Sequence, residues 1–129
     1  MKRASILSTV FILGALVLWG CAPAPVLNVN DESIVVGDKY SQEDVQKAIT
    51  RAGAQLGWQM KDVAPGHMVG TLRIRTHLAE VDIKYDKTKY SINYKDSVNL
   101  GYDGANIHKN YNVWISDLNK AIHSQLENM

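Results

Sequence analysis

The sequence predicts an α+β fold in which two helices pack on one face of a four-stranded antiparallel meander. Apolar side chains recur at helical spacing over residues 41–56 and again over 105–127. Between these segments, over 58–95, apolar and polar side chains alternate in four short runs joined by turn residues, which is typical of antiparallel strands. Two amphipathic helices and a half-buried sheet can bury one another's apolar faces. We therefore expect residues 34–129 to form one two-layer domain in the order helix, four strands, helix.

The first helix is expected from Ser41 to Leu56. Ser41 is a good N-cap because its hydroxyl can accept a backbone N–H of the first turn, and acidic residues follow where the helix dipole favours them. The small residues 52–54 make the apolar stripe thin, which predicts a bulky side chain packed closely against it. Gly57 is placed to end the helix in a left-handed conformation. The stripe consists of Val45, Ala48, Ile49, Ala52 and Leu56.

Four short strands are expected next, apolar on one face and polar on the other. On the polar face, Arg73 and Arg75 are expected to lie opposite Glu80 and Asp82 and to help fix the register of that strand pair. The runs of alternating side chains are 58–61, 70–75, 79–85 and 90–95, and the turns fall at 64–66, 76–77 and 86–89.

The final helix is expected over about 105–127, after a loop at 97–104. One face of this segment is apolar over its whole length, so we expect it to cover the sheet beside the first helix. Its stripe consists of Ile107, Tyr111, either Trp114 or Ile115, Leu118, Ile122 and Leu126.

The N-terminus has the three parts of an export signal. Lys2 and Arg3 form a short positive region, and the run from Ile6 to Trp19 carries no charge but is too short for the roughly 20 apolar residues of a membrane span. The run closes with Leu18-Trp19-Gly20-Cys21, which resembles the bacterial lipobox, although Trp19 stands where a small residue is usual. The resemblance implies a signal peptide over 1–20 and a lipidated Cys21.

A lipidated Cys21 would attach the mature protein to a membrane. The resemblance implies an S-diacylglycerol group on its sulfur and an N-acyl chain such as palmitate on its freed amine, and two or three such chains anchor a protein stably. Ala22 follows the cysteine, and by the sorting rule of Gram-negative lipoproteins this position implies the outer membrane, with the domain facing the periplasm. A plain secretory leader or an uncleaved anchor is the alternative.

Between the anchor and the domain we expect a tether over 21–33. The Pro23 and Pro25 rings favour an extended chain, and the residues up to Ser33 are polar and turn-rich. Little order is expected before Ile34, where the run 34–36 is a candidate edge strand.

Charge and cysteine usage exclude several classes of protein. Of the 14 basic residues, Lys2 and Arg3 belong to the leader, which leaves 12 against 13 acidic residues in the mature chain. A nearly neutral surface gives no electrostatic reason to expect nucleic acid as a partner. Cys21 is the only cysteine, so no disulfide can form within the chain.

Several runs of the sequence together resemble a known group of proteins, namely 52–58, 77–85, 90–94, 102–108 and 110–114. These runs cover most of the mature chain, and the group is that of small proteobacterial lipoproteins. The resemblance implies one compact domain in the cell envelope and supplies no activity.

A cluster of aromatic and hydrogen-bonding side chains lies between the last predicted strand and the final helix. Tyr102, His108, Asn110 and Asn112 are the candidate ligand-binding residues, because loops positioned by a rigid scaffold often carry binding groups. A structural role is the alternative, in which Asp103 caps the helix and the aromatic rings fill the core. The burial of these side chains distinguishes the two interpretations.

No pattern of catalytic or metal-binding residues is evident. The sequence has no Gly-x-Ser-x-Gly elbow, and Cys21 is consumed by the lipid. The histidines lack the spacing of zinc ligands on one helix face, so we expect no metal, no cofactor and no catalytic residues. They are His67, His77, His108 and His123.

Three classes of function stay open at this point. The favoured one is a non-enzymatic envelope lipoprotein that binds another envelope protein or has an accessory role at the outer membrane. The second is a binding module for peptidoglycan or another envelope polymer. The third is an enzyme, which requires a pocket with convergent titratable groups.

Overall fold

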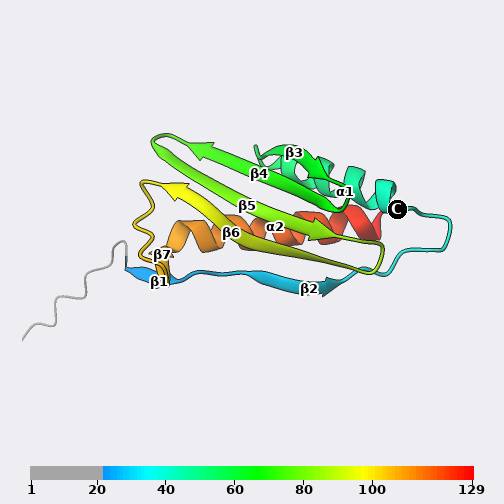
Figure 1. Cartoon of the computed structure of the whole chain (residues 1–129), viewed down its shortest axis with the longest axis horizontal. Helices are drawn as coiled ribbons and strands as arrows, with labels where there is room; N and C mark the ends of the chain where they lie inside the picture. Colours follow the sequence, from blue (N-terminus) through cyan, green and yellow to red (C-terminus); the bar gives the residue numbers. More distant parts are fainter. Residues whose placement is uncertain (1–21) are drawn as a thin grey trace, which may run out of the picture.

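The structure is a computed structural model that describes residues 22–129, so the predicted signal peptide and Cys21 lie outside the described residues. The α+β class is confirmed, with two helices and antiparallel strands (Figure 1). The predicted four-stranded sheet is wrong in number, because the strands form one sheet of five and another of two. The elements are β1 (Pro23–Pro25), β2 (Val29–Ser33), α1 (Gln42–Gln55), β3 (Gln59–Ala64), β4 (His67–Ile74), β5 (His77–Tyr85), β6 (Lys89–Val98), β7 (Asn106–His108) and α2 (Lys109–Glu127).

The predicted meander is present as β3 to β6, and a fifth strand extends it. The order in the larger sheet is β2-β6-β5-β4-β3. β2 pairs with β6 through Val29 opposite Ile92 and Ser33 opposite Lys89, and a bulge with Asp31 at a φ of 50° interrupts the pairing. The edge strand therefore comes before Ile34, and the run 34–36, which was a candidate edge strand, is not a strand.

The chain before Ile34 has more regular structure than the sequence predicted. β1 pairs antiparallel with β7, with Pro23 opposite His108 and Ala24 opposite Ile107. Proline cannot donate to a sheet ladder, but on a short edge strand its carbonyl can still accept. The prediction of little order before Ile34 is therefore wrong for β1 and β2, which are regular strands.

Both helices cover the same face of the larger sheet, as predicted. Figure 1 shows α1 and α2 running side by side behind the strands, and the two helices contact each other. The strands bury alternate side chains against them, while the other face of the sheet is exposed or half-buried. The core residues from the strands include Met68, Leu72, Ala79, Val81, Ile83, Tyr90 and Ile92, and those from the helices include Val45, Ala48, Ile49, Ala52, Tyr111, Ile115, Leu118 and Ile122.

Helix α1 forms where the sequence predicts it, but Leu56, which was expected in the apolar stripe, is the C-cap and is 40% exposed. The Ser41 hydroxyl accepts the backbone N–H of Asp44 at 3.2 Å, and the Asp44 carboxylate accepts the backbone N–H of Ser41 at 2.8 Å, which completes a capping box. These hydrogen bonds lower the pKa of Asp44. The bulky neighbour expected at the thin stripe is Met60, whose sulfur would lie 2.6 Å from a Cβ added at Gly53. Gly57 follows the helix at a φ of 85°.

Helix α2 begins at Lys109, four residues later than expected. Residues 106–108 pair with β1 instead, and His108 is the N-cap. The sequence left open whether Trp114 or Ile115 belongs to the apolar stripe. Ile115 does, because it is fully buried, while Trp114 is partly buried at the edge of the core.

The predicted ion pairs on the outer face of the sheet are wrong in register. Arg73 lies opposite Leu78, and Asp82 lies opposite Val69. The register places Leu72 beside Ala79 in the core, and a shift of one strand by one residue would move the apolar side chains of that strand to the outer face.

Tyr111 offers a test of the core because its buried hydroxyl has no hydrogen-bond partner within the described chain. An unsatisfied buried hydroxyl is unfavourable, so we expect Tyr111→Phe to raise the free energy of unfolding by about 1 kcal/mol. Tyr90→Phe is the matched comparison, because the Tyr90 hydroxyl donates to Asn119 Oδ1 at 2.5 Å and its loss should lower stability by about 1 kcal/mol. Urea unfolding measures both, and equal signs for the two variants would contradict this description of the core.

Candidate functional site

The predicted ligand-binding residues lie near one another at the end of the molecule where β1 meets β7. Tyr102 carries the largest aromatic ring among them, and 41% of its surface is exposed. Its ring stacks on Tyr94 with centroids 3.9 Å apart, and Tyr94 in turn meets the edge of Tyr111 at 5.7 Å. Burial raises the pKa of both Tyr94 and Tyr111. One face of Tyr102 is therefore occupied by the protein itself.

Asn112 connects α2 to the N-terminal segment. Its side-chain oxygen accepts the backbone N–H of Leu27 at 2.9 Å, and its side-chain nitrogen donates to the carbonyl of Pro25 at 2.8 Å. The amide is thus paired on both sides with the chain that leads in from Cys21. This is a structural role that holds the N-terminal segment against the domain.

His108 and Asp103 also make local hydrogen bonds. His108 Nδ1 accepts the backbone N–H of Asn110 at 3.1 Å, which is the N-cap contact of α2. Asp103 was expected to cap the helix, but its carboxylate accepts the backbone N–H groups of Asn106 at 2.7 Å and Ala105 at 2.9 Å. These contacts lower the pKa of Asp103 and tighten the turn before β7.

The structure thus brings three of the four candidates into contacts within the chain and leaves Asn110 exposed. Tyr102 and His108 keep part of their surface free, so ligand binding by this cluster stays a prediction. The contacts themselves serve to fix β1, β7 and the preceding loop to one another.

Asn112→Ala should loosen the N-terminal segment. The variant loses two hydrogen bonds to backbone groups, so we expect the free energy of unfolding to fall by about 1–2 kcal/mol. Amide hydrogen exchange at Ala24 and Leu27 should accelerate. Asn110→Ala is the matched control, because the Asn110 side chain is exposed, and the prediction is contradicted if the two variants exchange alike.

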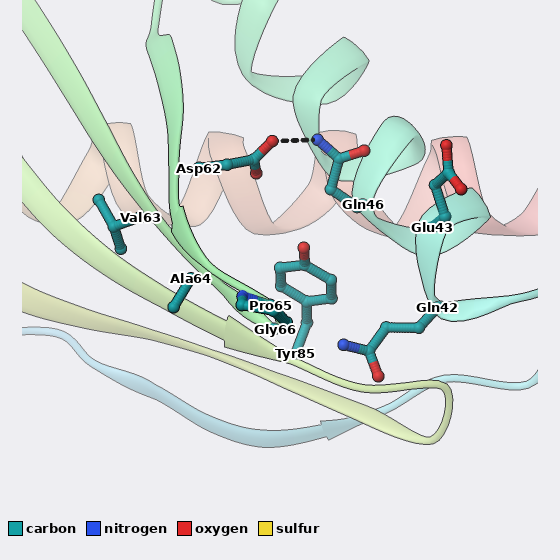
Figure 2. Close-up of a pocket in the computed structure, with 9 residues that line it drawn as sticks. All are labelled: Gln42, Glu43, Gln46, Asp62, Val63, Ala64, Pro65, Gly66 and Tyr85. Carbon is teal, nitrogen blue, oxygen red and sulfur yellow. Dashed lines mark hydrogen bonds between the residues drawn. The ribbon is translucent and has the colours of Figure 1, made fainter.

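A pocket that the sequence did not predict lies at the opposite end of the molecule, between α1 and the β3–β4 turn (Figure 2). It is open to solvent and has a volume of about 570 Å³. It is lined by Gln42, Glu43, Gln46, Asp62, Val63, Ala64, Pro65, Gly66 and Tyr85.

The polar groups of this pocket are acidic or neutral. Gln46 donates to the Asp62 carboxylate at 2.8 Å, and Figure 2 shows the Tyr85 hydroxyl pointing toward that pair. Burial, and then the charge of Asp62, raise the pKa of the Tyr85 phenol, so it stays protonated at neutral pH. With Glu43 and Asp62 and no basic side chain in its lining, the pocket favours a cationic or hydrogen-bond-donating group.

One signal in the sequence could have indicated this pocket. Trp58 and Met60 alternate toward the core, and the next residue on that face is Asp62, a charged and exposed side chain opposite the buried Met68. Such a departure from the pattern indicates either an error or a functional position. The turn at 64–66 was predicted, but its proximity to Gln42 depends on how α1 packs on the sheet.

All four histidines have partners, and two of these partners are carboxylates. Within residues 22–129, no group of three histidine, cysteine or acidic side chains is placed to hold a metal ion. The ring contacts are His67 with Asp82 at 2.7 Å, His77 with the Asn99 carbonyl at 2.6 Å, His108 with the Asn110 N–H at 3.1 Å, and His123 with Glu32 at 2.6 Å.

Comparison with family models, with characterised proteins and with solved structures finds no match to this chain. The resemblance to small proteobacterial lipoproteins therefore stays a prediction. Neither helix in the described part of the chain has the length and the apolar composition needed to cross a membrane.

Proposed function

We propose that this protein is a lipid-anchored lipoprotein of the bacterial outer membrane that faces the periplasm and has a non-enzymatic, partner-binding role. The observation that carries the proposal is the leader that ends in Leu18-Trp19-Gly20-Cys21. The fold suits such a role, because β1 starts two residues after Cys21 at one end of the domain. The acidic pocket then lies at the other end, where a partner can reach it (Figure 1).

The partner surface consists of the open edge of β3 together with this pocket. β3 is the last strand of the larger sheet, and its outer edge has no strand partner among the described residues. An open edge can accept an extended segment of another protein by main-chain hydrogen bonding. Val63, at the end of β3, is 47% exposed and gives an apolar contact beside the pocket. A basic side chain of the partner would complete the match with Asp62 and Glu43.

Photocrosslinking in intact cells tests the proposal. A photoreactive amino acid at position 63 should give one discrete adduct with another envelope protein, which mass spectrometry can identify. The control is position 113 on α2, where Val113 is similarly exposed at 54% but lies away from the edge of β3. Equal adducts at both positions, or none at position 63, would contradict the proposed surface.

Binding to peptidoglycan is the second candidate. The pocket combines side-chain amides of Gln42 and Gln46 with the Tyr85 phenol, and these groups suit the hydroxyl and amide groups of a glycan or its peptide stems. Cosedimentation with purified sacculi tests this alternative. Retention that is lost in Gln46→Ala would support it, and an absence of retention of the wild-type protein would exclude it.

A further inference from the structure

We propose that the end of the domain next to Cys21 rests on the membrane surface, as a docking face for lipid headgroups. We call this region the anchor-proximal end and define it as β1, residues 73–77 around the β4–β5 turn, and residues 98–110, which include β7. The inference rests on the proposed lipidation of Cys21. It goes further because it gives the domain one fixed orientation on the bilayer.

The first argument is the length of the link. The strand β1 begins at Pro23, so only Ala22 separates it from Cys21. Two residues of extended chain span at most about 7 Å. A lipidated sulfur held in the headgroup region therefore keeps β1 within that distance of the membrane surface, and no long tether is left to lift the domain away.

The second argument is that β1 is fixed to the domain. The strand pairs with β7, and the chain after it continues this contact, with the Val26 N–H donating to the Ala105 carbonyl at 3.0 Å. Asn112 of α2 then donates to the carbonyl of Pro25, the last residue of β1, and accepts the N–H of Leu27. The point at which the anchor enters is thus a defined place on the surface of the domain.

The third argument is that the anchor-proximal end is one continuous surface. The Asn99 side chain donates to the Thr76 hydroxyl at 2.8 Å, and the Asn99 carbonyl meets His77 Nδ1 at 2.6 Å. The His108 N–H donates to the Leu100 carbonyl at 2.9 Å, which joins the loop to β7. Figure 1 shows the β4–β5 turn, the end of β6 and β1 together at the left of the molecule, opposite the first turn of α1.

The fourth argument is the chemistry of this end. Three large apolar side chains are exposed here, namely Ile74 at 38%, Val98 at 56% and Tyr102 at 41%. Tyrosine is favoured at the level of the headgroups because its ring is apolar and its hydroxyl is polar. The segments 73–77 and 99–110 contain one acidic residue, Asp103, against three basic ones, which suits anionic phospholipids. The basic residues are Arg73, Arg75 and Lys109.

The orientation that follows places the acidic pocket away from the bilayer. Gln42 and Gly66 line the pocket at the first turn of α1 and at the β3–β4 turn, which lie at the opposite end of the long axis of the molecule (Figure 1). The membrane then occupies one end, and the partner surface stays open at the other.

The test uses the full mature protein, lipidated in cells and placed in vesicles of phosphatidylethanolamine and phosphatidylglycerol. Cys21 is the only cysteine and its sulfur is alkylated, so Val98→Cys and Val63→Cys each supply one free thiol for a fluorescent label. The two positions are similarly exposed, at 56% and 47%. We expect a headgroup-quencher lipid to dim the label at position 98 strongly and the label at position 63 little or not at all.

A charge reversal separates docking from mere closeness to the anchor. In the Val98→Cys protein, Arg75→Glu should at least halve the quenching, whereas Lys87→Glu, in the exposed β5–β6 turn at the far end, should leave it unchanged. Equal quenching at positions 98 and 63 would overturn the docking face. Quenching at position 98 that is unchanged by Arg75→Glu would also overturn it. If the fluorescence of the label at position 98 changes with protein concentration in the absence of vesicles, this face binds a second copy of the protein instead, and the docking face is overturned.

The failure of the anchor has a different signature. If Cys21 itself takes up the thiol label and the protein does not float with the vesicles, then the proposed lipidation is wrong. If the protein floats but the label at position 98 is not quenched, the lipidation stands and only the docking face is wrong.

Discussion

With Cys21 as the proposed attachment site, Cys21→Ser is expected to abolish lipid labelling of the protein completely. In the proposed anchor the lipid is joined through a thioether, and a serine hydroxyl does not replace that sulfur. Each buried methylene of an acyl chain contributes about 0.8 kcal/mol, so the loss of two or three chains should also weaken membrane binding strongly. Metabolic labelling with a clickable fatty acid, followed by fractionation, measures both the modification and the location.

Ala22→Asp is the matched control for this prediction. It alters the residue beside the cysteine and keeps the sulfur, so the label should be retained. By the sorting rule that the lipobox resemblance implies, this variant should stay at the inner membrane. A labelled Cys21→Ser protein, or a wild-type protein with a free thiol at position 21, would contradict the assignment.

The elements that the sequence predicted correctly are those with a strong local pattern. In α1 the apolar residues follow a helical period and Ser41 caps the first turn. In β4 to β6 the alternation is regular and the turns are tight. In α2 the stripe holds from Tyr111 to Leu126. Each of these signals lies within a few residues of chain, so the sequence alone is enough to detect it.

The three missed strands depend on partners that are distant in the sequence. β2 carries only one apolar residue, Val29, and pairs with β6 some sixty residues later, as in the contact of the Asp31 N–H with Ser91. β1 and β7 have three residues each and pair only with one another. Short polar edge strands carry no period of their own, so the pairing becomes visible only once the rest of the sheet is placed.

The same limit applies to the candidate sites. The candidate residues around Tyr102 and Asn112 were chosen because they are close together in the sequence, which could not show that Asn112 binds the N-terminal segment. The pocket combines Gln46, Asp62 and Tyr85 from three separate elements. Only the packing of α1 against β3 brings these side chains together.

Leu118→Ala should lower the free energy of unfolding more than Tyr90→Phe or Asn112→Ala does. Leu118 is fully buried on α2, in the layer that faces the sheet. Truncation of a buried leucine removes its transfer free energy and leaves a cavity, which together cost about 2–5 kcal/mol. Since a domain of this size is stable by only about 5–15 kcal/mol, the midpoint of urea unfolding should fall markedly.

Val113→Ala is the control for Leu118→Ala, because it truncates an exposed side chain on the same helix. Val113 lies on the same helix and loses side-chain carbons too, but it is 54% exposed, so we expect a change within about 0.5 kcal/mol. A similar loss of stability in both variants would mean that α2 does not cover the sheet. Because Asn112 on this helix also holds the N-terminal segment, Leu118→Ala should speed hydrogen exchange at Ala24 as well. The stability of the core and the attachment of the N-terminal segment then depend on the same helix.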